Sequence, residues 1–188
     1  MDIKKISDEE LVKSSLKDTE MFRVLMERYE QKLTYYIIRI SGFCLETAEE
    51  ILQDTFLKCW RNLNDFDQSV KFSSWIYRIA HNETISTYRK QKSRGEDQQL
   101  ELIEELFVPD KIDFVRDLDK KMSVQNIQEV LALMDVKYRE ILILKFLEEK
   151  SYEEISDIIQ KPLGTIATLI NRAKTQFKDI SNRHQISF

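Results

Sequence analysis

Residues that break helices are scarce in this chain of 188 residues, which contains three glycines and two prolines. Few turns are therefore dictated locally, and nearly the whole chain is free to form helix. Long apolar runs are also missing, and the amino-terminal segment MDIKKISDEE is too polar for a signal peptide. We therefore expect a cytoplasmic protein with no direct membrane insertion.

Cysteine and histidine occur only twice each. Cys44 and Cys59 lie far apart in apolar helical patterns, with no CxxC motif or Cys/His cluster beside them. This spacing predicts two buried thiols rather than a disulfide or a metal site. The chain also lacks a glycine-rich phosphate loop, and its carboxylates are explained by helix caps and solvated faces. These absences predict that the protein is not an enzyme and uses no cofactor.

The clearest patterns that the sequence does contain are signals for the starts of helices. Ser7–Glu10, Thr47–Glu50 and Ser151–Glu154 each have the form of a capping box, in which a hydroxyl and a carboxylate satisfy each other's backbone amides. Between the first two, apolar residues at helical spacing run as far as Gly42, which we predict to end that helix. The first half of the chain is therefore expected to form a compact bundle of helices.

The segment Ala48–Lys90 joins two helical patterns through a loop. Its helices are predicted to bury Ile51, Leu52, Thr55, Phe56, Cys59, Trp60 and Leu63, then Trp75, Ile76, Ile79 and Ile85. Lys71–Arg94 has six basic residues and one acidic residue, a net charge of +5 in a chain whose net charge is −4. A basic helix that also carries aromatic and amide side chains is typical of a nucleic-acid surface.

The composition changes abruptly at Gly95. Gly95–Asp119 contains nine acidic and two basic residues, a net charge of −7, together with Pro109. Two interpretations stay open: a solvated tether, or an acidic strap that occupies the path of a polyanion on a partner. We place this linker at residues 95–122, after a first domain at residues 1–94.

Residues 123–188 predict a second helical bundle. Within it, residues 151–174 have the pattern of a helix-turn-helix: a short capped helix, a tight turn through Lys161-Pro162 and a longer helix. Lys161–Arg183 has five basic residues and one acidic residue, a net charge of +4. The sequence therefore predicts an all-α fold of two small helical bundles joined by an acidic linker.

These motifs, in this order, resemble the bacterial RNA polymerase sigma factors, and most closely the extracytoplasmic-function (ECF) group, which keeps conserved regions two and four. In the first bundle the resemblance is carried by Ala48–Phe56, Trp60–Leu63 and Ser74–Ala80 with Asn82. In the second it is carried by Ser151–Ile155, Gly164–Ile166 and Arg172-Ala173. It implies a factor that binds core polymerase and directs promoter-specific initiation, with region two in residues 1–94 and region four in residues 123–188.

The resemblance assigns the contact with core polymerase to one polar ridge. This ridge would face the clamp helices of the largest subunit, and its residues are Glu50, Gln53, Asp54, Leu57, Lys58 and Arg61. On the residues alone, an ordinary solvated face explains the ridge equally well. The resemblance also implies a contact between the second bundle and the flap of the second-largest subunit. Family members are commonly held by an anti-sigma factor, so such a partner is expected.

Promoter contacts are implied on both bundles. The loop and helix after the ridge would melt the −10 element and capture unpaired bases, through Asn64, Phe66, Gln68, Lys71, Tyr77, Arg78, Asn82, Arg89 and Lys90. The recognition helix would read the −35 duplex, through Thr165, Ala167, Thr168, Asn171, Arg172 and Lys174. The sequence departs from the family at His81, Ala167 and Leu169, where basic residues are usual.

A stand-alone regulator, with a helix-turn-helix output and an amino-terminal interaction bundle, is the main alternative. Ala48–Lys90 argues against it, because an input domain has no need of a basic, aromatic loop and helix suited to single strands. A protein-only adaptor such as an anti-sigma factor is disfavoured by two basic DNA-facing helices in one chain. For the acidic linker, the resemblance implies a path through the active-site cleft of the polymerase.

Overall fold

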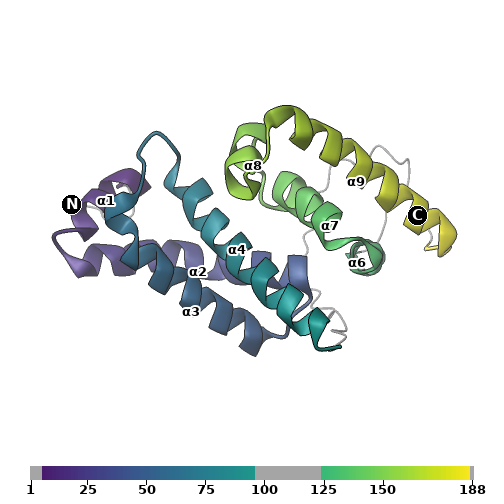
Figure 1. Ribbon diagram of the computed structural model, residues 1–188, viewed down its shortest axis with the longest axis horizontal. Coiled ribbons are helices and arrows are strands. Elements are labelled where there is room, and N and C mark those ends of the chain that lie inside the picture. Colours follow the sequence, from purple (N-terminus) through teal and green to yellow (C-terminus); the bar gives the residue numbers. More distant parts are fainter. Residues whose placement is uncertain (1–5, 96–123, 187–188) are drawn as a thin grey trace.

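The computed structural model describes residues 6–95 and 124–186, which form two helical bundles (Figure 1). The first bundle contains α1 (Asp8–Ser15), α2 (Thr19–Ser41), α3 (Leu45–Arg61) and α4 (Phe72–Ser93). The second contains α6 (Val124–Leu133), α7 (Val136–Leu142), α8 (Tyr152–Ile159) and α9 (Leu163–Arg183). The predicted all-α fold is confirmed, whereas the acidic linker beyond Gly95 lies outside the described residues.

Helix ends show which local signals decide the structure. Capping boxes form at Ser7 and Ser151, where each hydroxyl accepts from the backbone amide three residues on and the glutamate there accepts in return. Gly42 ends α2 in the left-handed region at φ 80°, as predicted. The capping box predicted at Thr47 does not form, because α3 already begins at Leu45 and Thr47 lies inside its first turn.

Aromatic side chains dominate the core of the first bundle. Phe43 and Phe72 are among its fully buried rings, and the equally buried Tyr36 and Tyr77 donate through their hydroxyls to carboxylates of the second bundle. The prediction that Trp60 belongs to this core is wrong: its side chain is 39% exposed and rests against Phe22, with 4.9 Å between ring centroids. Cys59 and Leu63 fill the core at the end of α3 instead, which leaves Trp60 on the rim.

The second bundle contains the predicted helix-turn-helix. Gln160, in the left-handed region at φ 52°, ends α8, and Pro162 precedes α9. Before α8, the chain widens into a π-helix, η5 (Ile143–Leu147), whose last turn is closed by the Glu148 amide donating to the Ile143 carbonyl. The core of this bundle is aliphatic apart from one ring, and includes Ile141, Ile155, Ile158, Ile166, Ile170, Ala173 and Phe177.

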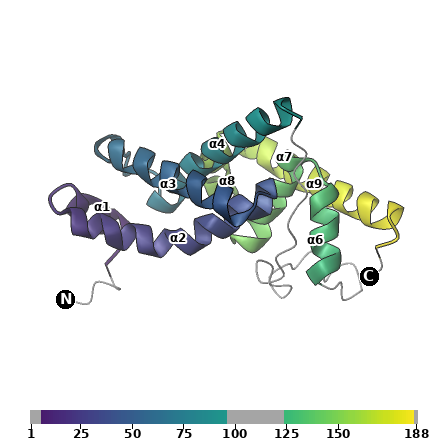
Figure 2. The same ribbon diagram turned by 90° about the horizontal axis from the view of Figure 1, so that it is seen from below.

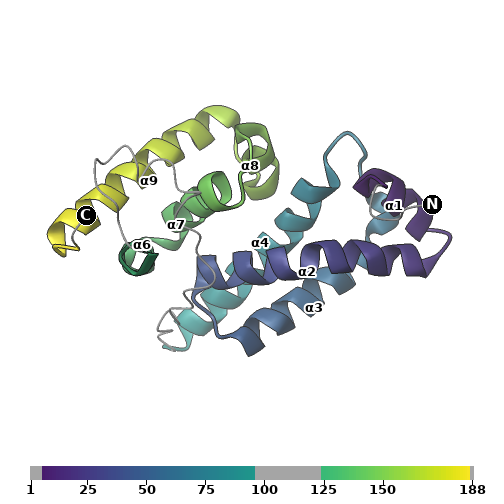
Figure 3. The same ribbon diagram turned by 180° about the vertical axis from the view of Figure 1, so that it is seen from behind.

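The two bundles lie against each other. In all three views the second bundle lies beside α4 of the first (Figure 1, Figure 2 and Figure 3). α8 packs along α4, and α7 contacts α2. This packing places the candidate DNA-binding elements of the two bundles on either side of one interface.

Candidate nucleic-acid and polymerase interfaces

The polar ridge of α3 is exposed along its whole length, at Glu50, Gln53, Asp54, Leu57, Lys58 and Arg61. It lies opposite the buried stripe of the same helix, as the helical period requires. Leu57 is 51% exposed and lies three residues from Trp60, so the two side chains are neighbours on the helix surface. Exposed apolar side chains next to charged ones are typical of a helix-on-helix interface. Trp60 is the member of this face that the sequence analysis missed.

The loop after α3 presents polar side chains to solvent. It begins with a short 3-10 turn, Leu63–Asp65, and the Ser69 amide then donates to the Asp67 carboxylate at 2.9 Å. This backbone hydrogen bond lowers the pKa of the Asp67 carboxyl group. Among the −10 candidates of this loop, the exposed residues are Asn64, Gln68 and Lys71.

Phe66 does not share this exposure. Its side chain is 8% exposed, and its ring lies 5.7 Å from that of Phe72 and 5.1 Å from that of Trp75, between centroids. The expectation of a free ring here is wrong for this conformation, because the ring completes the aromatic core at the start of α4. Trp75 is only half-buried, as are Ile79 and Ile85, so of the four side chains predicted to be buried on α4, Ile76 alone is fully enclosed.

α4 carries the remaining −10 candidates. Asn82, Arg89 and Lys90 are exposed, and Arg78, one turn before Asn82, is half-buried. Tyr77 is 1% exposed, which contradicts its expected position on a DNA-facing surface. The second bundle encloses it: its hydroxyl donates to Glu148 at 2.6 Å, and the Lys150 ammonium group lies 4.2 Å from the centroid of its ring.

α9 directs its −35 candidates away from the core of the second bundle. The exposed ones are Thr165, Thr168, Asn171 and Arg172, and Ala167 and Lys174 are half-buried. The Thr168 hydroxyl donates to the Gly164 carbonyl at 3.0 Å, one turn earlier. The Lys174 ammonium group lies 5.2 Å from the centroid of the Phe146 ring, which draws this cation toward the bundle.

Charged and polar pairs connect the bundles, which sequence analysis did not foresee. His81 of α4 contacts Glu140 of α7, and Lys71 lies 3.1 Å from the Glu154 carboxylate of α8. Glu148 is a third acceptor of this kind. No local pattern predicts such pairs, because their members lie in different domains of the sequence.

A cavity of about 880 Å³ lies between the bundles. The −10 candidate Arg89 and the −35 candidates Thr165 and Arg172 all line it. Its charged lining residues are mostly basic, with Arg89, Lys92, Lys137, Lys161 and Arg172 against Glu140. Candidate DNA contacts of the two bundles therefore line the same cavity.

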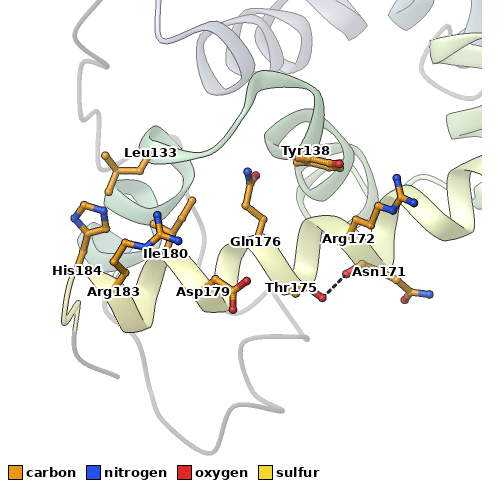
Figure 4. A pocket seen from close by; sticks show the side chains of 10 residues that line it. All are labelled: Leu133, Tyr138, Asn171, Arg172, Thr175, Gln176, Asp179, Ile180, Arg183 and His184. Carbon is orange, nitrogen blue, oxygen red and sulfur yellow. Dashed lines mark hydrogen bonds between the residues drawn. The ribbon is translucent and has the colours of Figure 1, made fainter.

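A second cavity, of about 640 Å³, lies beside the carboxyl-terminal half of α9 (Figure 4). Leu133, which is 51% exposed, and Ile180 give it an apolar part, while Asp179 and Arg183 add opposite charges. Figure 4 also shows the Thr175 hydroxyl donating to the backbone carbonyl of Asn171. Such a groove suits an amphipathic helix or strand of a protein partner.

The described residues offer no metal site. Across residues 6–95 and 124–186, His, Cys, Asp and Glu nowhere gather in a group of three suited to a metal ion. Within these ranges neither cysteine takes part in a disulfide; Cys59 is buried as predicted, whereas Cys44 is half-buried, with its sulfur 3.4 Å from the Thr47 hydroxyl. In the same ranges, no helix has the length and apolar character needed to cross a bilayer.

Two family models match the chain: sigma-70 region 2 over residues 25–94 and sigma-70 region 4 over residues 124–177. The ECF RNA polymerase sigma factor SigW of Bacillus subtilis is 33% identical over 168 residues, which cover 84% of this chain and 87% of the relative. The ECF RNA polymerase sigma-E factor of Escherichia coli K12 is 27% identical over 182 residues, covering 90% of this chain and 91% of the relative.

Two solved structures share the fold. CnrH in complex with the cytosolic domain of CnrY superposes with a TM-score of 0.67 at 19% identity, over 92% of this chain and 96% of that one. The sigma factor RpoE of Bartonella quintana, in complex with the anti-sigma factor NepR, gives a TM-score of 0.63 at 22% identity, over 86% of this chain and 96% of that one. At these identities the likeness concerns the fold alone.

Proposed function

The chain belongs to the ECF RNA polymerase sigma factors, which are non-enzymatic factors of transcription initiation, and from this membership we propose its specific contacts. The protein binds core RNA polymerase in the cytoplasm and directs it to promoters with defined −35 and −10 elements. One observation carries the proposal: two regions that match sigma-70 regions 2 and 4 each expose candidate DNA-binding residues within one chain.

The polar ridge of α3 is the proposed docking site for the clamp helices of the largest subunit. Its exposure, together with the exposed apolar side chains of Leu57 and Trp60 beside it, supports this assignment. The end of the second cavity formed by Leu133 and Ile180, away from Arg172 at its other end (Figure 4), is the proposed site for the flap of the second-largest subunit. Both surfaces combine exposed apolar groups with charged rims, as helix-recognition sites do.

The −10 element is the proposed ligand of the loop after α3 and the exposed side of α4. Asn64 and Gln68 offer amide groups to base edges, and Asn82 and Arg78 extend this surface by one helical turn. Lys71, Arg89 and Lys90 supply positive charge for the phosphates. Phe66 and Tyr77 are left out of this surface, because both are buried.

The −35 duplex is the proposed ligand of the amino-terminal half of α9. Thr165, near the start of the helix, is suited to a phosphate contact, and Asn171 and Arg172 are suited to base edges. Ala167 and Thr168 present methyl groups, which favour contacts with thymine. Both relatives with similar folds were solved with a partner, CnrY for CnrH and the anti-sigma factor NepR for RpoE, which supports an anti-sigma partner for this chain.

Transcription with purified core polymerase tests the proposal. A genomic DNA library would first identify the promoters that the reconstituted enzyme transcribes. On such a promoter, Arg172→Ala should weaken −35 recognition by about 1–3 kcal/mol, the value of a good bidentate base contact. Assembly with core polymerase, measured by size-exclusion chromatography, should stay intact.

Lys178→Ala is the matched control, because it removes one exposed cation from the same helix further from its amino-terminal half. It should leave promoter selection unchanged. Equal losses from the two substitutions would mean that α9 contributes only general positive charge. A protein that fails to bind core polymerase at all would contradict the proposed function.

A further inference from the structure

One carboxylate of the second bundle bridges two helices of the first. Glu140 of α7 accepts a hydrogen bond from the Tyr36 hydroxyl of α2 at 2.6 Å. The same carboxylate oxygen lies 2.5 Å from Nδ1 of His81, on α4. Glu140 is therefore inserted where α2 and α4 meet.

Glu148 repeats this arrangement with residues about one turn away on the same two helices. Its carboxylate pairs with the Arg39 guanidinium group of α2 at 2.8 Å and accepts from the Tyr77 hydroxyl of α4 at 2.6 Å. Glu140 and Glu148 stand on either side of the π-helix η5, whose wider turn changes the helical register between them. We call Glu140 and Glu148 the acidic latch.

The partners of the acidic latch share a face on each helix. Tyr36 and Arg39 are three residues apart on α2, and Tyr77 and His81 are four residues apart on α4, so each pair lies on one side of its helix. Each of the two carboxylates thus contacts one residue of α2 and one residue of α4. This correspondence distinguishes the latch from a single chance contact.

The acidic latch is almost removed from solvent. The side chains of Glu140 and Glu148 are 5% and 8% exposed, and that of Arg39 is 9% exposed. Burial raises the pKa of the Tyr36 and Tyr77 hydroxyls, which keeps them protonated as donors. Water can hydrate all of these groups once the bundles separate, unlike the apolar surfaces of a permanent interface. Such buried polar pairs suit a contact between the bundles that forms and dissociates reversibly.

The closed arrangement occupies part of the face proposed for the −10 element. Lys71, one of the cations proposed for the −10 phosphates, is paired with Glu154 of the second bundle at 3.1 Å. The cavity that remains between the bundles, about 880 Å³, has the size of a small-ligand pocket rather than of a DNA duplex. Arg89 of α4 and Arg172 of α9 both line this cavity, which is too small for promoter DNA.

We propose that the acidic latch holds the free protein in a closed state in which its own carboxylates take the place of DNA phosphates. Opening separates the bundles and releases Lys71, Arg89 and Arg172 for DNA. The identity of the excluded ligand rests on the proposed function, whereas the closed state itself does not. Polymerase or promoter DNA that binds only the open form shifts this equilibrium.

Zero-length crosslinking measures the closed state directly. A carbodiimide joins Lys71 and Glu154 through an amide, with loss of water, when the amine and the carboxylate lie in contact as they do here at 3.1 Å. Peptide mass spectrometry of the full-length protein quantifies this amide. Glu140→Gln/Glu148→Gln should lower its yield several-fold, because Arg39 loses the charge of its buried partner and the closed state is weakened.

Glu129→Gln/Glu153→Gln is the matched control, since it removes two carboxylate charges from exposed positions of the same bundle. Its amide yield should equal that of the unaltered protein. Tyr36→Phe supplies a second, uncharged disruption of the latch and should also lower the yield. Near-ultraviolet circular dichroism verifies that each variant keeps its packed cores. An unchanged yield in folded latch variants overturns the latch.

A binding experiment with single-stranded DNA tests whether the closed state excludes DNA. The probe is a fluorescein-labelled strand of about twelve thymidines, a length within the site sizes of single-strand binding folds. Glu140→Gln/Glu148→Gln should bind it about tenfold more tightly than the unaltered protein, within the usual range of coupling between two equilibria. The control pair should not. Equal affinities of the latch variant and the unaltered protein, including no measurable binding by either, overturn the exclusion of DNA. If the unaltered protein instead fails to direct transcription by core polymerase, that result counts against the proposed function alone.

Discussion

Burial determines the chemistry of the two thiols at the scale of single residues. Cys59 lies in the core, and burial raises the pKa of its thiol to about 12, whereas Cys44 is half-buried beside Thr47. The thiolate is the reactive form, so we expect iodoacetamide at about pH 8 to alkylate Cys44 in the native protein and Cys59 only after unfolding. Peptide mass spectrometry over a time course measures both rates, and equal rates would contradict the burial of Cys59.

Arg139 is a buried cation with little compensation. It is 4% exposed, and Nη2 donates to the Met134 carbonyl at 3.2 Å, while within the described part of the chain no group accepts from Nε or Nη1. Burial accordingly lowers the pKa of its guanidinium group. Because a well-packed apolar side chain often replaces a buried charge without loss, Arg139→Met should leave the free energy of unfolding unchanged or raise it by about 1–4 kcal/mol.

Arg139→Ala is the comparison that separates charge from packing. It removes the same charge but also the aliphatic stem, so it should lower the midpoint of thermal unfolding. Differential scanning calorimetry of the full chain records both variants. A Met variant as unstable as the Ala variant would mean that the guanidinium group itself stabilises the second bundle.

The burial of single side chains was the least predictable feature of the sequence. Ile76 and Phe56 follow the helical period and are buried as predicted, but Trp60 lies one position off the filled core at the end of α3. Tyr77 was assigned to the DNA-facing surface by the family resemblance. Its burial comes from the other bundle, which no local period encodes.

At the scale of elements, replacing Gly42 or Gly164 by alanine should change the stability of the protein in opposite directions. Gly42 ends α2 at φ 80°, a conformation that costs an L-residue about 1–2 kcal/mol, so Gly42→Ala should destabilise the first bundle by about that amount. Gly164 lies inside α9, and nothing lies within 4 Å of a Cβ added there. Gly164→Ala should therefore stabilise the protein by about 0.4–1 kcal/mol. Chemical denaturation of the two variants measures both signs, and a shared sign would refute the conformational argument.

Helix ends were predictable where a side chain closes its own turn. Ser7 and Ser151 form their capping boxes, because each box involves residues only three apart. Thr47 carries the same signature but lies inside α3, since Cys44 takes the N-cap position, although its side chain caps no backbone amide of the helix. The π-helix η5 has no comparable signature, and it was not foreseen.

At the scale of the whole molecule, the contact between the bundles exceeds what the sequence can predict. Tyr36 and Glu140 meet although 104 residues separate them in the sequence. Charge patterning revealed a basic surface on each bundle, but not that carboxylates of the second would cover part of the first. The division into two helical bundles depends on local periodicity and was predictable, whereas their docking depends on distant pairs of side chains.

This docking leads to a prediction for the free protein. The chain has a net charge of −4, and its basic faces are small and partly occupied by its own carboxylates. Each phosphate contact contributes a slope of about −0.9 to the logarithmic salt dependence of duplex binding, so a protein with few accessible contacts should show weak binding and a shallow slope. We expect fluorescence anisotropy to show that the free protein binds promoter duplex no better than scrambled duplex.

The same two duplexes should be clearly distinguished after core polymerase is added. Tight and specific binding by the free protein would instead favour a stand-alone helix-turn-helix regulator, because such a protein must present its recognition helix without a partner.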